Sequence, residues 1–180
     1  TETLVDAILN ENLQGKTLLE LGTGSGAISI SIAQENKDCF IFATDISIKS
    51  ILVAKQNAAK FYCENIIFLN HDWNNEWLFP QVDYLISNPP YVDKEATTGR
   101  EEGIWFEPEK ALFSKDRGLS DLKSILSKGK NFLTENGKVY LEHAPDQYEE
   151  LNKFAEENGY LNFSNLNDLN GDKRVSIYQC

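Results

Sequence analysis

The tetrapeptide Asn88-Pro89-Pro90-Tyr91 combines residue types that can bind a planar NH2 group. Two successive prolines lack backbone N–H groups and fix their φ angles, so they end a strand and leave carbonyl oxygens unpaired. Asn88 adds a side-chain oxygen that accepts hydrogen bonds, and Tyr91 adds an aromatic face with a polar tip. The pattern predicts a corner whose oxygens accept the two amino hydrogens while the ring stacks on the amine plane. A plain proline turn after a strand is the structural alternative.

A second segment, Glu20 to Gly26, alternates glycine with other residues in the order Glu-Leu-Gly-Thr-Gly-Ser-Gly. It follows the strand-like residues 17–19 and precedes the helical pattern of residues 28–33. Glycines adopt positive φ angles and let a ligand approach the main chain, and the start of a helix offers unpaired N–H groups. This strand, loop and helix predict a ligand-binding loop.

Together the two motifs resemble class I S-adenosylmethionine-dependent methyltransferases, the first segment their amino-methylating motif and the second their cofactor loop. Further segments narrow the resemblance to the release-factor glutamine methyltransferases, because they occur in the expected order over nearly the whole chain. These segments are Phe106-Glu107-Pro108, Ala111-Leu112, Leu141-Glu142-His143 with Gln147, and Asp172-Lys173-Arg174-Val175.

The resemblance implies a reaction, a cofactor, a partner and a set of site residues. S-adenosyl-L-methionine would donate a methyl group to the side-chain amide nitrogen of the glutamine in the Gly-Gly-Gln motif of bacterial class I peptide-chain release factors, leaving S-adenosyl-L-homocysteine. The residues implied at the reacting amide are Asn88, Pro89, Pro90 and Tyr91. Those implied at the cofactor are Glu20, Gly22, Thr23, Gly24, Ser25, Gly26, Asp45, Ile46, Asp72, Trp73 and Asn88. Members of this family usually carry a helical domain ahead of the catalytic one, and we expect residues 1–180 to be the methyltransferase catalytic domain without it.

Asp45 ends a predicted strand over residues 39–44 and lies 19 residues beyond Gly26. In a doubly wound sheet this spacing brings the end of the second strand beside the first loop, where a carboxylate can accept hydrogen bonds from both ribose hydroxyls. Asp72 and Trp73 follow the third predicted strand at the same end of the sheet, which suits adenine recognition. The alternatives are a helix-capping or solvated Asp45, with Ser47 as another candidate cap, and a Trp73 that only covers the core.

The order of elements predicts an α/β fold, a Rossmann-like class I methyltransferase with a seven-stranded, mostly parallel sheet, helices on both faces and an antiparallel C-terminal strand. Besides the strands above, we expect strands over residues 66–69, 82–87, 138–142, 160–166 and 175–179. Helices are expected over residues 3–13, 25–34, 47–61, 119–133 and 145–158. Ser120 or Asp121 is expected to cap the fourth helix, and Asn136-Gly137 to end it.

Residues 92–109 form a polar stretch that is longer than a plain connection. We interpret it as a flap that admits and holds the substrate peptide. Glu107 lies within it, and an anchoring role is favoured over contact with the substrate. Glu142 and His143 could suggest acid–base chemistry, but a pair at a strand end is more often hydrogen-bonded structure.

The 180 residues carry a formal net charge of -11, whereas phosphate backbones are bound by clustered Lys and Arg, so we expect no direct nucleic-acid binding. Lys123, Lys128 and Lys130 are interpreted as the solvated face of a helix. The three cysteines are widely spaced, which favours free thiols in a reducing cytoplasm over a disulfide framework or a metal site. No apolar run is long enough for a membrane span, and we expect a cytoplasmic monomer.

Other functions remain open at this point. An N-methyltransferase acting on an exocyclic amine of adenine or guanine could use the same tetrapeptide. A non-catalytic protein that binds S-adenosylmethionine or a release factor is a second class. A dinucleotide oxidoreductase is more remote, because the loop spacing is Gly-x-Gly-x-Gly.

Overall fold

The computed structural model describes residues 1–93, 113–114 and 118–180. Most of the predicted flap, residues 92–109, lies outside the described residues, and so does Glu107. The first two residues of this stretch form the short strand β5 (Val92–Asp93), which pairs in parallel with β6 (Phe113–Ser114).

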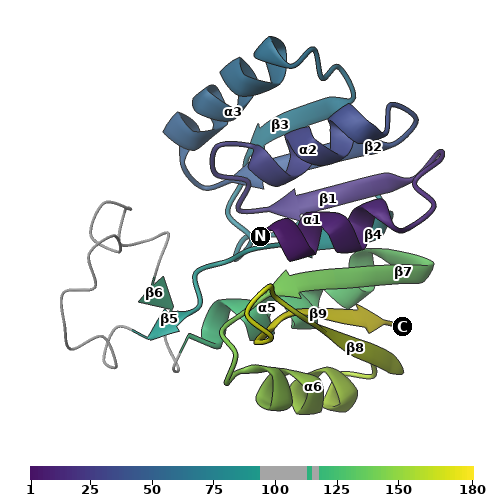
Figure 1. The fold of residues 1–180 in the computed structure, drawn as a ribbon, viewed down its shortest axis with the longest axis vertical. Helices are drawn as coiled ribbons and strands as arrows, with labels where there is room; N and C mark the ends of the chain where they lie inside the picture. Colours follow the sequence, from purple (N-terminus) through teal and green to yellow (C-terminus); the bar gives the residue numbers. More distant parts are fainter. Residues whose placement is uncertain (94–112, 115–117) are drawn as a thin grey trace.

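Seven strands form one sheet in the order β3-β2-β1-β4-β7-β9-β8. Its members are β1 (Thr17–Leu21), β2 (Phe40–Asp45), β3 (Ile66–Asn70), β4 (Val82–Ser87), β7 (Leu133–Glu142), β8 (Asn162–Asn167) and β9 (Lys173–Gln179). The first five of these pair in parallel, whereas β9 runs antiparallel to both β7 and β8. In Figure 1 the arrowheads of β1 and β7 point toward the side where β5 and β6 lie, and β9 points the opposite way. The predicted sheet, with its antiparallel C-terminal strand, is confirmed.

Helices cover both faces of the sheet because successive strand residues point to opposite sides. Leu18 of β1 packs in a cluster with α1 (Glu2–Leu9) and α2 (Ala27–Glu35), and α3 (Ile48–Lys60) joins α2 over β2 and β3. The next residue, Leu19, packs instead with α5 (Ser120–Gly129) and α6 (Tyr148–Glu157). The near-continuous apolar strands are therefore buried on both sides.

Several predicted element bounds were wrong. The first helix ends at Leu9 rather than Leu13, although Leu13 is still buried beneath the following loop. The fourth helix begins after Leu119, and no side chain caps it, so neither Ser120 nor Asp121 is the cap. The last helix begins at Tyr148, later than predicted. Ser47 does cap α3, since its hydroxyl accepts a hydrogen bond from the Ser50 N–H at 3.2 Å.

The predicted turn at Asn136-Gly137 is a bulge within β7 rather than the end of a helix. Val82 pairs with Leu133 and Tyr84 pairs with Lys138, so residues 134–137 bulge opposite Asp83. A single-turn 3-10 helix, Lys130–Phe132, separates α5 from this strand. The prediction that Asn136-Gly137 ends a helix was wrong, because Leu133 pairs with a distant strand and both residues fall within β7.

The three lysines near α5 are structural, which corrects their interpretation as a solvated face. Lys123 forms an ion pair with Glu150 of α6, with 2.7 Å between Nζ and Oε1. Lys130 Nζ donates hydrogen bonds to the carbonyl oxygens of Asn158 and Gly159 at 3.1 and 2.8 Å. Lys128 binds carbonyls near the predicted site. Their charges therefore hold chain segments in place.

Candidate active site

The glycine loop leaves β1 and enters α2 with Gly22, Gly24 and Gly26 all at positive φ, between 56° and 85°. Two of its amides are tied to the end of β2, because Thr23 N–H donates to the Thr44 carbonyl at 2.8 Å and Gly24 N–H donates to Asp45 Oδ2 at 2.9 Å. A Cβ on Gly24 would meet no atom within 4 Å. Its Cα therefore faces open space, as a loop that receives a ligand requires.

The Glu20 side chain forms hydrogen bonds to the glycine loop and to the helix that follows it. This side chain is buried, and Oε2 accepts hydrogen bonds from the hydroxyls of Thr23, at 2.7 Å, and Ser29. Burial raises the pKa of the Glu20 carboxyl above its ordinary value, and the hydroxyl donors only partly offset this. Its other oxygen, Oε1, is buried without a hydrogen-bond partner among the described residues. A buried acceptor of this kind is normally met by a donor from a ligand or an ordered water.

Asp45 stands at the end of β2 and accepts two backbone hydrogen bonds. Oδ2 accepts from Gly24 N–H at 2.9 Å, and Oδ1 accepts from Ser47 N–H at 2.8 Å. Neither predicted alternative holds, because Ser47 caps α3 and Asp45 is buried rather than solvated, beside the glycine loop. The next residue, Ile46, exposes 51% of its surface and offers an apolar contact at the same rim.

Asn70 was not predicted to matter, yet it joins the ends of β2 and β3. Its side-chain amide donates to the carbonyl oxygens of Asp45 and Ile46 at 2.9 and 2.8 Å. Asn70 is exposed at the end of an edge strand, and no sequence signal pointed to it.

Trp73 lies against the glycine loop and also packs on the core. A Cβ on Gly22 would come within 3.2 Å of the Trp73 ring. Its indole N–H donates to Asp121 of α5 at 3.3 Å, and the ring joins the core cluster on that face of the sheet. Asp72 shapes its own turn, because Oδ1 accepts from Asn74 N–H at 2.9 Å.

Lys128 holds the turn that carries Trp73. Its ammonium donates to the carbonyl oxygens of Trp73, Asn74 and Asn75 at 2.8, 2.7 and 3.2 Å. An ammonium group has three protons, and each can meet one of these carbonyls. The sequence showed only a lysine on a helix.

The tetrapeptide follows β4, beside β1 in the sheet. The Ser87 hydroxyl donates to the Leu21 carbonyl at 2.7 Å, which ties the start of the tetrapeptide to the start of the glycine loop. Pro89 and Pro90 are buried, and Asn88 is partly exposed. The Asn88 amide nitrogen donates to the Thr1 hydroxyl at 3.0 Å, and the other end of the amide is an oxygen that can only accept hydrogen bonds.

The structure thus brings together the groups that the sequence pointed to. The glycine loop contacts Asp45 and Trp73 directly, and the Ser87 hydrogen bond places Asn88 next to the same loop. All come from the carboxyl ends of parallel strands, where ligands bind in doubly wound sheets. Glu142 and His143 lie at the end of β7 in hydrogen-bonded positions. His143 Nε2 lies 2.7 Å from the Ser176 hydroxyl, and Tyr91 donates to Glu142 Oε1 at 3.3 Å.

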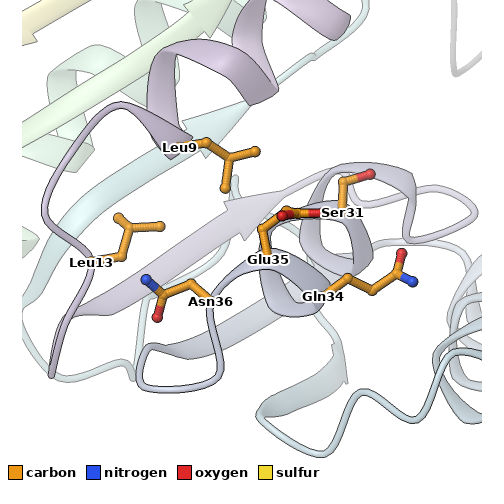
Figure 2. Close-up of a pocket in the computed structure, with 6 residues that line it drawn as sticks. All are labelled: Leu9, Leu13, Ser31, Gln34, Glu35 and Asn36. Atoms are coloured by element: carbon orange, nitrogen blue, oxygen red, sulfur yellow. The ribbon is translucent and has the colours of Figure 1, made fainter.

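A separate pocket of about 450 Å³ lies away from these residues. Figure 2 shows its lining, with Leu9 and Leu13 facing residues from the second half of α2. The start of α2 adjoins the glycine loop, so the end of the helix lies toward the opposite edge of the sheet. None of the predicted site residues lines this pocket.

Two general features of the described residues bear on function. No group of three or more His, Cys, Asp or Glu side chains in this part of the chain could hold a metal ion. Across the same residues, every helix is too short or too polar to cross a membrane.

Comparison with solved structures agrees with the fold. The chain superposes on a methyltransferase from Pyrococcus furiosus with a TM-score of 0.72 and 19% identity, covering 99% of this chain and 83% of that one. A ribosomal protein L11 methylase from Lactobacillus delbrueckii subsp. bulgaricus gives a TM-score of 0.70 at 17% identity, covering 99% and 78%. At these identities the likeness shows the Rossmann-like methyltransferase fold alone.

Curated proteins give closer sequence matches. The chain is 34% identical over 181 residues to a release factor glutamine methyltransferase of Aliivibrio fischeri, covering 99% of this chain and 64% of that protein. It is 33% identical over 178 residues to the Escherichia coli protein of the same name, covering 98% and 64%. A bifunctional methyltransferase of Rickettsia bellii is 37% identical over 166 residues, covering 91% and 30%. The chain thus spans less than two thirds of the length of these relatives.

The family model described as methyltransferase small domain matches residues 1–105, which include the glycine loop and the tetrapeptide. With more than half of the chain matched and with the sheet order and loop geometry above, the chain belongs to the methyltransferase small domain family.

Proposed function

We propose that this chain transfers a methyl group from S-adenosyl-L-methionine to the side-chain amide nitrogen of a glutamine in a peptide-chain release factor. The observation that carries the proposal is the Ser87–Leu21 hydrogen bond, which sets Asn88 beside the glycine loop. Direct methyl transfer to an NH2 group needs the groups that bind the amine to lie next to the loop that binds the cofactor. The names of the curated relatives supply the target, a release factor glutamine.

The residues at the strand ends fit S-adenosylmethionine. Open space at Gly24 lets a ligand approach the protein main chain, and the Glu20 oxygen that has no partner among the described residues can accept from an ammonium group or a water that it holds. Asp45 would bind the ribose hydroxyls while keeping its two backbone hydrogen bonds, because a carboxylate accepts about four. Exposed Ile46 and the turn at Asp72 and Trp73 would flank the adenine. When bound, the cofactor supplies a methyl group made electrophilic by a cationic sulfur.

The chain's own residues hold the acceptor amide. An amide nitrogen is a poor nucleophile because its lone pair is shared with the carbonyl, so orientation must provide much of the rate. The Asn88 side-chain oxygen and the Pro89 carbonyl would accept the two amide hydrogens and fix the plane of the NH2 group, and the Tyr91 ring would stack on it. Positioning of this kind contributes about 7–11 kcal/mol in favourable cases. After transfer the nitrogen is strongly acidic, and its proton can pass to water without a dedicated base.

We further propose the Gly-Gly-Gln glutamine of class I release factors as the acceptor, residues 1–180 as a catalytic domain, and a monomer in the cytoplasm as the working form. The competing acceptor is an exocyclic amine of a nucleic-acid base. The net charge of -11 disfavours it, since a phosphate backbone needs basic partners.

The test is transfer of labelled methyl from S-adenosylmethionine to three acceptors offered side by side. These are an intact release factor, the same factor with its Gly-Gly-Gln glutamine changed to alanine, and a mixture of nucleic acids. We expect label on the intact factor alone. Label on nucleic acid, or equal label on the two factors, would overturn the proposed target.

The Asn88→Ala variant tests the assigned role of the tetrapeptide. Loss of one positioned hydrogen-bonding group typically lowers kcat by about 10²–10³-fold, and we expect a loss of that size with unchanged cofactor affinity by calorimetry. A parallel loss of cofactor affinity would contradict the assignment of Asn88 to the acceptor amide.

A further inference from the structure

The local structure at the start of α6 does not explain why a glutamine stands at position 147. It is the N-cap residue of α6, yet its side chain makes no capping hydrogen bond, and glutamine is not among the favoured caps. The residue exposes only 4% of its surface. The polar atoms of a buried amide form hydrogen bonds, so the groups that they contact indicate the role of the side chain.

The oxygen and the nitrogen of the Gln147 side-chain amide each form a hydrogen bond to a segment that follows a strand. Oε1 accepts from Ala144 N–H, just beyond β7, at 2.9 Å, and Nε2 donates to the carbonyl oxygen of Tyr91 at 3.0 Å. The backbone N–H of Ala144 can only donate, which fixes the orientation of the amide and makes the group facing Tyr91 a donor. The contact with Tyr91 spans 56 positions in sequence.

Gly118 packs on this hydrogen bond. It has a φ of +82°, and a Cβ at this position would lie 2.0 Å from the Tyr91 carbonyl oxygen and 2.5 Å from Gln147 Nε2. Any larger residue would push the two groups apart. The close approach of a glycine therefore shields the Tyr91–Gln147 contact and leaves it no room to shift.

The Tyr91 side chain has a second contact from β7. Its hydroxyl donates to Glu142 Oε1 at 3.3 Å, which is long for an O–H donor. The carbonyl contact from Gln147 is thus the better-formed of the two. Together they hold the backbone and the ring of the residue that ends the tetrapeptide.

We propose that Gln147 is a positioning residue for methyl transfer, which acts by fixing Tyr91 so that its ring forms one wall of the site for the acceptor amide. The inference rests on the proposed function. Without the Nε2 donor, the Tyr91 carbonyl loses this hydrogen bond, and the position of the ring relative to Asn88 is less well fixed. The rate then falls while cofactor binding, which uses other strand ends, stays intact.

The test compares Gln147→Glu with Asn152→Ala. Glutamate has nearly the same shape and can still accept from Ala144 N–H, but as a carboxylate it cannot donate to Tyr91. Asn152 lies on the same helix and is half-buried; its Nδ2 donates to Asn165 Oδ1 at 3.0 Å and its Oδ1 accepts from Tyr178 at 3.2 Å. Neither contact of Asn152 involves Tyr91.

For Gln147→Glu we expect kcat with a release factor to fall by about 10²-fold, the size of effect that a small misplacement produces, with unchanged affinity for S-adenosylmethionine. Hydrogen exchange of a peptide containing Tyr91 should become faster in this variant. Asn152→Ala should lower the melting temperature without either change. A wild-type kcat for Gln147→Glu, an equal kcat loss in Asn152→Ala, or a matching loss of cofactor affinity would overturn the inference.

Failure of the proposed function would be distinguishable from failure of this inference. If the wild-type chain labels no release factor, the proposed target is wrong, and hydrogen exchange near Tyr91 still decides the role of Gln147. Faster exchange in Gln147→Glu alone would support the contact as a fixing element. Equal exchange in wild type and variant would refute it.

Discussion

At the scale of single residues, the polar groups of the site serve both the fold and the ligand. Asp45 anchors two backbone amides, and Glu20 binds two hydroxyls while one of its oxygens has no partner among the described residues. A carboxylate can do both because it has more acceptor sites than the protein uses. Ligand binding and loop geometry are therefore coupled at these residues.

Asp45→Ala should weaken cofactor binding in two ways. The variant loses a proposed ribose contact, and it releases Gly24 N–H from the partner that holds the loop. Hydrogen bonds to charged groups are worth about 1.5–3 kcal/mol, so we expect an affinity loss of about 10- to 100-fold by calorimetry. Asp45→Asn keeps one acceptor oxygen and should lose less. Wild-type affinity in both variants would remove Asp45 from the cofactor site.

At the scale of elements, helices on both faces of the sheet hold the loops at the strand ends in place. Lys128 of α5 holds the turn after β3 by three carbonyl contacts, and Asn57 of α3 donates to the Ser25 carbonyl in the glycine loop at 3.0 Å. Loops have few backbone partners of their own, so side chains from rigid helices satisfy their carbonyl groups.

Lys128→Met should loosen the turn that carries Trp73 while keeping the aliphatic packing of α5. Three carbonyl oxygens lose their donor at once, and we expect a loss of about 1–3 kcal/mol in stability, read from chemical denaturation. Cofactor affinity should fall as well. Lys123→Met removes the same charge from the same helix but contacts Glu150 instead, so it serves as the control. Equal affinity losses in the two variants would point to charge rather than to the turn.

At the scale of the whole molecule, β7 and β9 join the site to the antiparallel end of the sheet. His143 is fully buried, with Nδ1 at 2.8 Å from the Ala144 carbonyl and Nε2 at 2.7 Å from Ser176 on β9. Burial lowers the pKa of His143 below its ordinary value, although the Ala144 carbonyl partly opposes this.

The stability of the whole fold should therefore depend on pH through His143. Because its folded-state pKa is lowered, its contribution is complete above the unfolded pKa of about 6.5 and is lost as the pH falls through the folded value. We expect the melting temperature of wild type to drop between pH 7 and pH 5 more than that of His143→Gln. The difference between the two curves isolates this residue from the carboxylates that titrate in both. Parallel curves would show that His143 does not carry the effect.

The sequence by itself determined the fold class and the edge of the sheet at which the candidate site residues meet. Apolar strands, a glycine loop and a pair of prolines that ends a strand are local signals. In a parallel sheet the residues after each strand meet at one edge, whatever their distance in the chain. These local signals predict that Asp45, Trp73 and Asn88 lie near one another. The placement of Ser47 as a cap followed from the same local chemistry.

Only the tertiary structure decided which polar side chains hold the site together. Gln147 and Tyr91 are 56 positions apart, and Lys128 and Trp73 are 55 apart, so their contacts depend on strand order and helix placement rather than on local pattern. The bulge at residues 134–137 was missed for the same reason, because pairing with Val82 and Tyr84 overrode a turn signal. Periodicity and turn chemistry act over a few residues, whereas hydrogen bonds between elements form only after the sheet has assembled.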